Sequence, residues 1–561
     1  SFFCEDPTRL TKMSGRILYS SGRIVFIQLL LLAGFIALLA RLIYLQIYQD
    51  IFLEDQVFER LDSNYSLLAP RGKILDRNNK VLALDVKGYS VGVDLSKFEY
   101  SDEIILFLSE ILDKQPSSLF KAIKGRSAGY KEISRNINLQ EKELLQGKKI
   151  KGLYFKENLR RAYPEKDAVS HVVGLTDIDR KGIQGTELVF HRELLGIEGR
   201  FEGIKGSRNT KLEGKRIGAV SGENINLTID INIQSIVYHE LQKAIKEYNA
   251  EAGSVIVVEP RTGEILALVN SPSFDPSDRK NLKDMSRLRN RATVDVFEPG
   301  SVLKPIAMSA ILDEDHTKSI LSIDTSPGWI EYEGFKTSDF RNYGLLTLSE
   351  IISLSSNVGM VKLCKDQDID SLVSYYEKFG IGRYPTSIML PAREGYLPHS
   401  NQFTPRDKVS SCYGYGMTLS ALQIAQAYSV FANEGNFVEL SLFKGTQFNE
   451  PFSERVIKEQ TNQLILDMLV ETVNSKRGTA SKAKLKNRLV AGKTGTAKET
   501  MQEETTYTAT FAGFVPYDKP EFLTVVVMHG LSGEESSGGK VSAPIFSNIM
   551  EQIFLFRELN I

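Results

Sequence analysis

The residues Glu298-Pro299-Gly300-Ser301-Val302-Leu303-Lys304-Pro305 form the stretch around which this chain is organised. The Pro-Gly pair marks a turn. A helix is predicted to begin at about Ser301, because apolar residues follow at helical spacing, at Val302, Ile306, Ala310 and Leu312. Pro305 is compatible with that helix, since the amides of a first turn have no intrahelical partner. Ser301 and Lys304 are three positions apart, so the stretch places a nucleophilic hydroxyl and a candidate base on one helical face.

Ser-x-x-Lys is weak evidence by itself, because the chain also contains it at Ser118/Lys121, Ser277/Lys280, Ser441/Lys444 and Ser481/Lys484. The pair at Ser301 gains support from the order of the motifs that follow it. These are Ser355-Ser356-Asn357 and then Lys493-Thr494-Gly495-Thr496, and Lys-Thr-Gly occurs once in the chain. The three motifs together predict one catalytic site.

Each polar residue of this set has a chemical reason to be there. Lys304 can accept the proton of Ser301 only if burial or a neighbouring positive charge lowers its pKa, and Lys493 is predicted to supply that charge. The hydroxyl of Ser355 is predicted to pass a proton between Lys304 and a leaving amine. Asn357 can hold a peptide carbonyl or amide, because its side chain has both a donor and an acceptor.

The third motif is predicted to bind substrate. Gly495 allows close approach to the backbone of a strand, and an exposed strand there can bind an extended peptide by strand addition. The hydroxyls of Thr494 and Thr496 are candidates for binding a terminal carboxylate. The backbone amides of Ser301 and Thr496 are predicted oxyanion-hole donors.

The composition excludes several classes of function. The 561 residues include 69 Lys and Arg against 70 Asp and Glu, so no basic excess indicates nucleic-acid binding. The three cysteines, Cys4, Cys364 and Cys412, show no metal-binding spacing and no disulfide framework, and buried packing is the predicted role of Cys364. No His-Glu-x-x-His and no Gly-x-Ser-x-Gly is present. We therefore expect neither a metal nor a cofactor.

An apolar run near the N-terminus predicts a single membrane span. Residues 24–40 contain Gln28 as their one strongly polar residue. Arg41 can snorkel to the interface, so that residues 42–47 lengthen the span. Residues 1–23 carry Arg9, Lys12, Arg16 and Arg23, which predicts a cytoplasmic tail by the positive-inside rule. A buried soluble helix and a cleaved signal peptide are the alternatives. With an uncleaved anchor, everything after about residue 48 lies outside the membrane.

The remainder divides into a mixed α/β pedestal at 48–223 and a second domain at 224–561. In the pedestal we predict two short strands within residues 71–83, a separate strand over 89–94 and helices over 101–122. In the second domain Asp230 is the predicted N-cap of an amphipathic helix. Predicted strands lie at 253–258, 264–269, 489–496, 508–515 and 522–528, and a closing helix at 545–556. The fold class is thus α/β (α+β), with helices covering a five-stranded antiparallel sheet and a helical part inserted after the first hairpin.

The motif set resembles the penicilloyl serine transferases, and more closely the division-specific class B penicillin-binding proteins, the FtsI family. Beyond the three catalytic motifs, the resemblance rests on segments spread over nearly the whole chain after residue 24. They are Arg71-Gly72 with Asp76-Arg77, Arg161 with Tyr163-Pro164, Gly182 to Glu187, Arg289-Asn290-Arg291, Val296 to Ser301, Tyr413-Gly414-Tyr415-Gly416-Met417 and Gly538 to Phe546. Cys412 stands where a small or apolar residue is expected, so the role of its thiol is open.

The resemblance implies a single-pass inner-membrane protein with a periplasmic pedestal and a periplasmic transpeptidase domain that cross-links peptidoglycan at the septum. Ser301 would attack the penultimate D-Ala carbonyl of a stem peptide, and an amine from a neighbouring stem would resolve the acyl-enzyme. A β-lactam would acylate the same serine. An FtsW-type glycan polymerase and other divisome proteins are the implied partners.

Three alternatives compete with this interpretation. An elongation-specific transpeptidase more often has Ser-x-Asp as its second motif, so Ser355-Ser356-Asn357 favours division. A β-lactamase needs a Glu that activates water, and no such Glu with a Leu-Asn context lies between Ser355 and Lys493. A membrane-anchored β-lactam sensor or scaffold usually has several spans and a cytoplasmic effector, whereas this sequence predicts one span.

Overall fold

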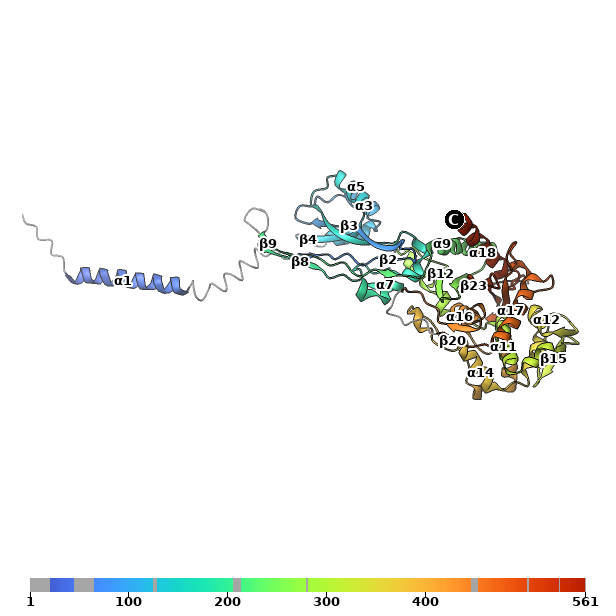
Figure 1. Cartoon of the computed structure of the whole chain (residues 1–561). Helices are drawn as coiled ribbons and strands as arrows, with labels where there is room; N and C mark the ends of the chain where they lie inside the picture. The colour runs from blue at the N-terminus through green and yellow to red at the C-terminus, as the bar shows by residue number, and fades with distance from the viewer. Residues whose placement is uncertain are drawn as a thin grey trace, which may run out of the picture. The chain divides into compact units, whose positions relative to one another are not determined.

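A computed structural model describes residues 21–44, 65–124, 129–204, 213–278, 281–444, 453–501, 504–533 and 535–559 (Figure 1). The chain divides into two units, of which one comprises residues 1–67 with 198–219 and the other comprises 68–197 with 220–561. The first unit contains helix α1 and a three-stranded antiparallel sheet. Its elements are α1 (Ser21–Ile43), β1 (Tyr65–Leu67), β8 (Gly199–Ile204) and β9 (Glu213–Ile217).

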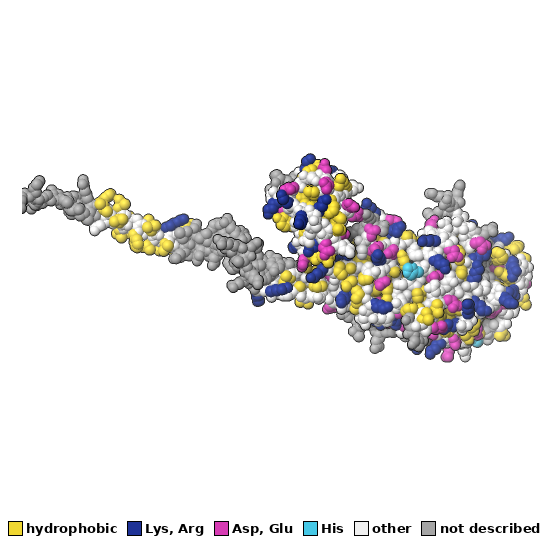
Figure 2. Space-filling view, turned by 90° about the horizontal axis from the view of Figure 1, so that it is seen from above, with side chains coloured by type: hydrophobic (Ala, Val, Ile, Leu, Met, Phe, Trp, Pro, Cys, Tyr) yellow, Lys and Arg dark blue, Asp and Glu magenta, His cyan; other side chains and the backbone are white. Residues whose placement is uncertain are grey.

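Helix α1 is the predicted apolar helix. Its segment Val25–Ile43 is 19 residues long, none of it is buried, and its length and composition suffice to cross a membrane. Figure 2 shows hydrophobic side chains along its surface. Residues 1–20 of the predicted tail, residues 45–47 of the predicted span and residues 48–64 of the predicted pedestal lie outside the described residues.

The second unit begins with the pedestal sheet, in which β10, β2, β3 and β4 are neighbours in that order and β5 also pairs with β3. Its strands are β2 (Ile74–Leu75), β3 (Val81–Asp94), β4 (Tyr130–Ile137), β5 (Leu153–Ala162) and β10 (Ile225–Asn226). Helices α3 (Asp102–Ile111), α4 (Pro116–Lys124) and α5 (Leu139–Gly147) contribute buried apolar side chains to a core shared with this sheet. The predicted hairpin after Arg71 is confirmed, but the strand predicted separately at 89–94 is the second half of β3.

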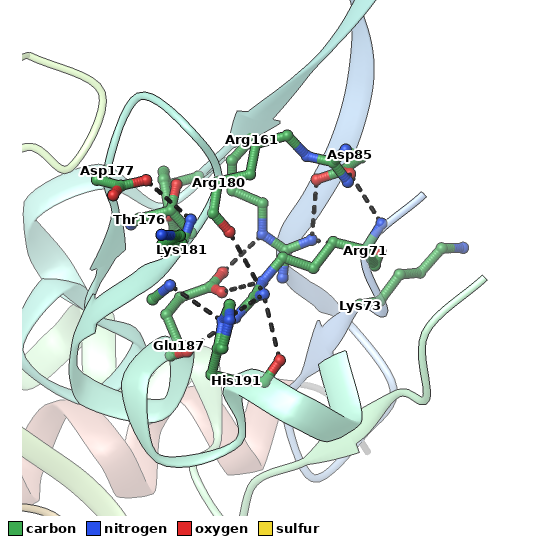
Figure 3. Close-up of polar contacts among 12 residues, drawn as sticks. Arg71, Lys73, Asp85, Arg161, Thr176, Asp177, Arg180, Lys181, Glu187 and His191 are labelled. Carbon is green, nitrogen blue, oxygen red and sulfur yellow. Dashed lines mark hydrogen bonds and ion pairs between the residues drawn. The ribbon is translucent and has the colours of Figure 1, made fainter. Parts of the chain in front are cut away.

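Short elements follow β5 within the pedestal. They are α6 (Ser170–Val173), β6 (Leu175–Thr176), β7 (Gly182–Gln184), α7 (Gly185–Val189) and α8 (His191–Leu194). A buried ion network joins them to β3 and β5 (Figure 3). Arg71 Nε and Arg161 Nε donate to the two carboxylate oxygens of Glu187 at 2.5 and 2.6 Å, and Asp85 pairs with Arg161 and Arg180 at 3.2 and 2.7 Å. These residues therefore hold distant pedestal segments together.

The second domain is built on a five-stranded antiparallel sheet with the strand order β12-β11-β23-β22-β21. Its strands are β11 (Ala252–Glu259), β12 (Glu264–Ser271), β21 (Ala491–Met501), β22 (Glu504–Val515) and β23 (Phe522–Leu531). Both faces are covered, because successive residues of β11 enter different cores. Val255 and Val257 pack with α9 (Ile231–Glu247) and α18 (Ser542–Leu559), whereas Ile256 and Val258 face the core of the inserted helices.

The inserted part lies between β12 and β21 in the sequence, as predicted. Its helices are α10 (Arg291–Val294), α11 (Lys304–Glu314), α12 (Leu348–Ser353), α13 (Asn357–Cys364), α14 (Ile369–Lys378), α15 (Pro405–Ser411), α16 (Ala421–Ala432) and α17 (Glu459–Asn474). Its strand pairs are β13 (Val296–Phe297) with β18 (Leu419–Ser420), β14 (Ser322–Asp324) with β17 (Leu345–Thr347), β15 (Trp329–Tyr332) with β16 (Phe335–Ser338), and β19 (Asn436–Val438) with β20 (Ser453–Arg455). The fold class expected from the sequence is thus confirmed.

A disulfide joins Cys364 at the end of α13 to Cys412 just after α15, with a Cα–Cα distance of 6.6 Å. Both cysteines are fully buried. The prediction that the cysteines form no disulfide framework is therefore wrong for this pair, and Cys364 does more than fill space in the core. The sequence alone does not predict this pairing, because 48 positions separate the two residues and no local pattern connects them.

Candidate active site

Ser301 lies in a tight turn that packs directly against the edge strand of the sheet. The turn is the 3-10 helix η5 (Gly300–Leu303), which continues into α11, so the helix predicted from Ser301 onward is confirmed with a 3-10 first turn. Gly300 has φ +57°, and its amide donates to Gly414 O at 3.0 Å. A Cβ on Gly495 would lie 2.8 Å from Pro299 O. The missing side chain of Gly495 therefore lets β21 approach the turn that carries the nucleophile.

Lys304 is fully buried at the start of α11. Its Nζ donates to Ser355 O at 2.6 Å, to Ser355 Oγ at 3.1 Å and to Asn357 Oδ1 at 2.7 Å. Burial lowers the pKa of Lys304 well below its usual value, the charge of Lys493 lowers it further, and Asp339 opposes both effects. The amine is therefore held in an environment that favours its neutral, proton-accepting form.

Lys493 approaches the same hydroxyl from β21. Its Nζ donates to Ser355 Oγ at 3.0 Å and to Thr494 O at 3.1 Å, and its side chain is fully buried. Burial lowers its pKa from 10.5 to about 7. Ser355 Oγ thus lies between two buried amines, one from α11 and one from the sheet.

Ser355 occupies the short connection between α12 and α13, and its φ of +61° is unusual for a residue with a side chain. Asp339 holds the next residues in place. Its carboxylate accepts from Ser356 Oγ at 2.6 Å, from Asn357 N at 2.5 Å and from Val358 N at 3.0 Å. Asp339 was not among the predicted site residues, since an Asp in an irregular segment carries no sequence signal for this contact.

The remaining predicted residues lie along β21. Thr494 Oγ1 donates to Thr479 Oγ1 at 3.1 Å, and Thr496 Oγ1 accepts from Gly538 N at 3.1 Å. A Cβ on Gly300 would lie 3.1 Å from Thr496 O and 3.6 Å from Thr496 N. The backbones that carry the two predicted oxyanion donors, Ser301 and Thr496, are therefore adjacent.

The structure brings Lys304, Ser355, Asn357 and Lys493 into one hydrogen-bonded group. Ser301 is half-buried beside them, and within the described part of the chain its hydroxyl makes no hydrogen bond. The four other Ser-x-x-Lys pairs named in the sequence analysis differ from the Ser301 pair. Their lysines Lys121, Lys444 and Lys484 are exposed, and Lys280 lies outside the described residues. Burial next to a second lysine distinguishes the Ser301 pair from these three.

Two family models match the chain. Residues 253–551 match the penicillin binding protein transpeptidase domain, and residues 66–227 match the penicillin-binding protein dimerisation domain. The probable peptidoglycan D,D-transpeptidase PenA of Neisseria gonorrhoeae is 32% identical over 541 residues, which cover 95% of this chain and 92% of that protein. Peptidoglycan D,D-transpeptidase FtsI of Escherichia coli is 30% identical over 538 residues, which cover 93% and 90%.

Solved structures agree with this comparison. Penicillin binding protein 3 of Mycobacterium tuberculosis, solved in complex with aztreonam, superimposes with a TM-score of 0.67 at 25% identity, and the match covers 88% of this chain and 97% of that one. The transpeptidase domain of penicillin-binding protein 3 from Burkholderia pseudomallei gives a TM-score of 0.53 at 31% identity, with coverage of 60% and 96%.

Proposed function

This chain belongs to the penicillin-binding protein family of peptidoglycan D,D-transpeptidases, and we propose that it cross-links stem peptides at the division septum through an acyl-enzyme on Ser301. The observation that carries the proposal is the buried group in which Lys304 and Lys493 both donate to Ser355 Oγ, beside a serine three positions before Lys304. This group provides a base with a lowered pKa next to a nucleophile.

In the acylation step, neutral Lys304 takes the proton of Ser301 Oγ as that oxygen attacks the penultimate D-Ala carbonyl of a stem peptide. The backbone amides of Ser301 and Thr496 stabilise the oxyanion, an effect worth roughly 3 kcal/mol per donor in comparable sites. The proton then passes through Ser355 Oγ to the amine of the leaving D-Ala. Lys493 supports this step because its charge favours the neutral form of Lys304.

Substrate binding is assigned to the edge of the sheet. The donor peptide lies along β21 by strand addition, with its terminal carboxylate at the hydroxyls of Thr494 and Thr496. Asn357 orients a peptide group of the bound donor peptide. Deacylation follows when an amine of a neighbouring stem peptide attacks the ester carbonyl and returns the proton to Ser301 Oγ. A β-lactam enters the same pathway and remains on the serine.

We further propose a single-pass arrangement in the inner membrane. Residues 1–23 form a cytoplasmic tail, 24–47 the signal anchor, 48–223 the periplasmic pedestal and 224–561 the periplasmic transpeptidase domain. Support comes from the apolar helix α1, from the basic residues that precede it in the sequence, and from the buried disulfide Cys364–Cys412, since disulfides persist in oxidising compartments. An FtsW-type glycan polymerase and other divisome proteins are the proposed partners.

The decisive experiment for the mechanism is labelling of the purified chain with a fluorescent penicillin, followed by peptide mapping. We expect one adduct, on Ser301, and none in a Ser301→Ala variant. An adduct at any other residue would overturn the mechanism. Release of the label within seconds would indicate a β-lactamase.

The place of action needs a separate test. The septal role is supported by Ser355-Ser356-Asn357, by Val296-Phe297-Glu298 before the nucleophile, and by the name FtsI of the Escherichia coli relative. Depletion of the protein is expected to block septa, whereas rounded cells would indicate an elongation-specific transpeptidase. Septation supported by the Ser301→Ala variant would favour a sensor or scaffold over catalysis.

A further inference from the structure

A cleft of about 460 Å³ opens beside the active site, and Asn357 is the one of its lining residues that the proposed mechanism uses. It is bounded by β16, by the start of α15 and by the segment that follows Cys412. The lining residues that matter are Glu298, Lys336, Asn357, Arg406, Asp407 and Tyr415. None of the residues that line it belongs to β21, where the donor peptide is placed. The cleft is therefore a second approach to the same reacting centre.

The cleft reaches the catalytic group at two points. Asn357 Oδ1 accepts from Lys304 Nζ at 2.7 Å, so one wall of the cleft is in direct contact with the proposed base. Glu298 stands three residues before Ser301, in the strand-to-turn connection that positions the nucleophile. A ligand held in this cleft therefore lies next to the ester that Ser301 would form.

The two cations of the cleft are held in place without ion pairs. Arg406 Cζ lies 4.0 Å from the centroid of the Phe335 ring, and Lys336 Nζ lies 4.5 Å from the Trp329 ring. Cation–π contacts of this kind fix a charged group but do not neutralise it. Neither cation forms a salt bridge with any residue in the described ranges, and both side chains are exposed.

The carboxylates of the cleft are already engaged in local structure. Asp407 accepts from Thr404 N at 3.2 Å and from Thr404 Oγ1 at 2.6 Å, and so caps α15. Glu298 Oε1 accepts from Gly416 N at 3.0 Å. These donors are uncharged, so both carboxylates keep their charge, but their hydrogen bonds fix them to the protein. Lys336 and Arg406 are the side chains of the cleft that can bind a carboxylate of a ligand.

We propose that this cleft binds the acceptor stem peptide, and that Lys336 and Arg406 hold a carboxylate of that peptide while its amine faces the acyl-enzyme. This inference rests on the proposed function of Ser301. The acceptor peptide carries both a carboxylate and an amine. Its free C-terminus provides the carboxylate, and the reaction requires the amine. Lys336 and Arg406 can bind the carboxylate of this peptide, which leaves its amine free to approach Lys304 and the ester.

The chemical step in this arrangement is aminolysis of the ester. The acceptor nitrogen forms a new bond to the carbonyl carbon, the bond from that carbon to Ser301 Oγ breaks, and the nitrogen loses one proton. That proton returns to Ser301 Oγ through Lys304 and Ser355, so no external reagent is needed. Positioning of the amine competes with attack by water, and the ratio of amide to hydrolysed product therefore reports occupancy of the cleft.

The test uses the full chain in detergent, acylated by a thioester analogue of the D-Ala-D-Ala donor. Two synthetic tripeptides with a free side-chain amine serve as acceptors, one with a C-terminal carboxylate and one with a C-terminal amide. The amide-to-hydrolysis product ratio is measured for the wild type, for Lys336→Ala, for Arg406→Ala and for the double variant. The exposed Lys519→Ala variant, remote in sequence from the cleft, is the matched loss of one positive charge.

We expect the wild type and Lys519→Ala to prefer the carboxylate acceptor. Each cleft variant is expected to lower aminolysis by that acceptor about two- to fivefold, the range for loss of one exposed charged contact. The double variant should treat both acceptors alike, while reaction with the amide acceptor and penicillin labelling of Ser301 stay at wild-type levels.

Three results would overturn the inference. One is a preference for the carboxylate that persists in the double variant. Another is an equal loss with both acceptors, which would assign the cleft to a glycan or to folding. The last is no preference in the wild type while penicillin still labels Ser301, which rejects the acceptor site but leaves the proposed function intact. Absence of labelling on Ser301 would instead reject both.

Discussion

Replacing both bridged cysteines by alanine, as Cys364→Ala with Cys412→Ala, should destabilise the transpeptidase domain strongly. The bridge closes a loop of 48 positions, and the loop-closure relation for the unfolded chain gives about 4 kcal/mol for that length at 25 °C. Loss of two buried sulfur atoms adds about 1 kcal/mol each through the cavities left behind. With a urea slope near 3 kcal/mol per M, the unfolding midpoint should fall by more than about 1 M.

The sole tryptophan makes the measurement specific, because Trp329 lies in β15 of the same domain and its fluorescence reports unfolding there. Urea titrations of the full chain in detergent would compare the wild type, both single variants and the double variant. Either single change breaks the bridge, so each should cost nearly as much as the double change. Cys4→Ala is the control and should leave the midpoint unchanged. Small and additive effects of the two single changes would refute the bridge as a source of stability.

Three more changes test the site and the pedestal. Lys493→Met removes a positive charge that, together with burial, lowers the pKa of Lys304. The pKa of Lys304 should therefore rise, and penicillin should acylate the enzyme only at higher pH. An acylation pH profile that does not move, or that moves to lower pH, would contradict this. Gly495→Ala places a Cβ 2.8 Å from the backbone of the nucleophile's turn and should slow acylation by about tenfold or more, whereas Gly147→Ala, with nothing within 4 Å, should not. Glu187→Ala leaves two buried arginines without their shared carboxylate and should cost about 3–5 kcal/mol in urea unfolding, without change in the urea-free acylation rate.

Elements with local signals were predictable from the sequence. The run Val255–Val258 before a Pro-Arg-Thr-Gly turn indicated a buried strand, and it forms the centre of β11. Asp230 was predicted as an N-cap, and its Oδ1 accepts from Asn232 N at 2.9 Å. In both places the side chain acts on residues only a few positions away, so the pattern itself contains the information.

The length of β3 was not predictable in the same way. Asp85 interrupts the apolar residues between the second strand predicted within 71–83 and the strand predicted at 89–94. The sequence therefore predicts two strands where the structure has one. In the folded protein that carboxylate is buried between Arg161 and Arg180, so the strand continues through it. A polar residue in a strand becomes favourable only when its partners arrive from distant segments.

The candidate site also combines residues that sequence motifs predict with residues whose contacts depend on distant segments. Motif order predicts Lys304, Ser355, Asn357 and Lys493 as site residues, and these four lie in one hydrogen-bonded group. Asp339 could not be found, because its contacts to the start of α13 depend on how an irregular segment folds back. The cysteine pairing was likewise invisible until α13 and α15 were placed.

The glycines around the nucleophile limit how the enzyme can change under selection by antibiotics. At Gly414 a Cβ would lie 2.0 Å from Gly300 O, and at Gly495 it would lie 2.8 Å from Pro299 O, so both positions admit no side chain without moving the turn. Variation that reduces drug acylation but preserves wall synthesis is therefore expected outside these two glycine positions. The turn that carries Ser301 is expected to stay unchanged under such selection.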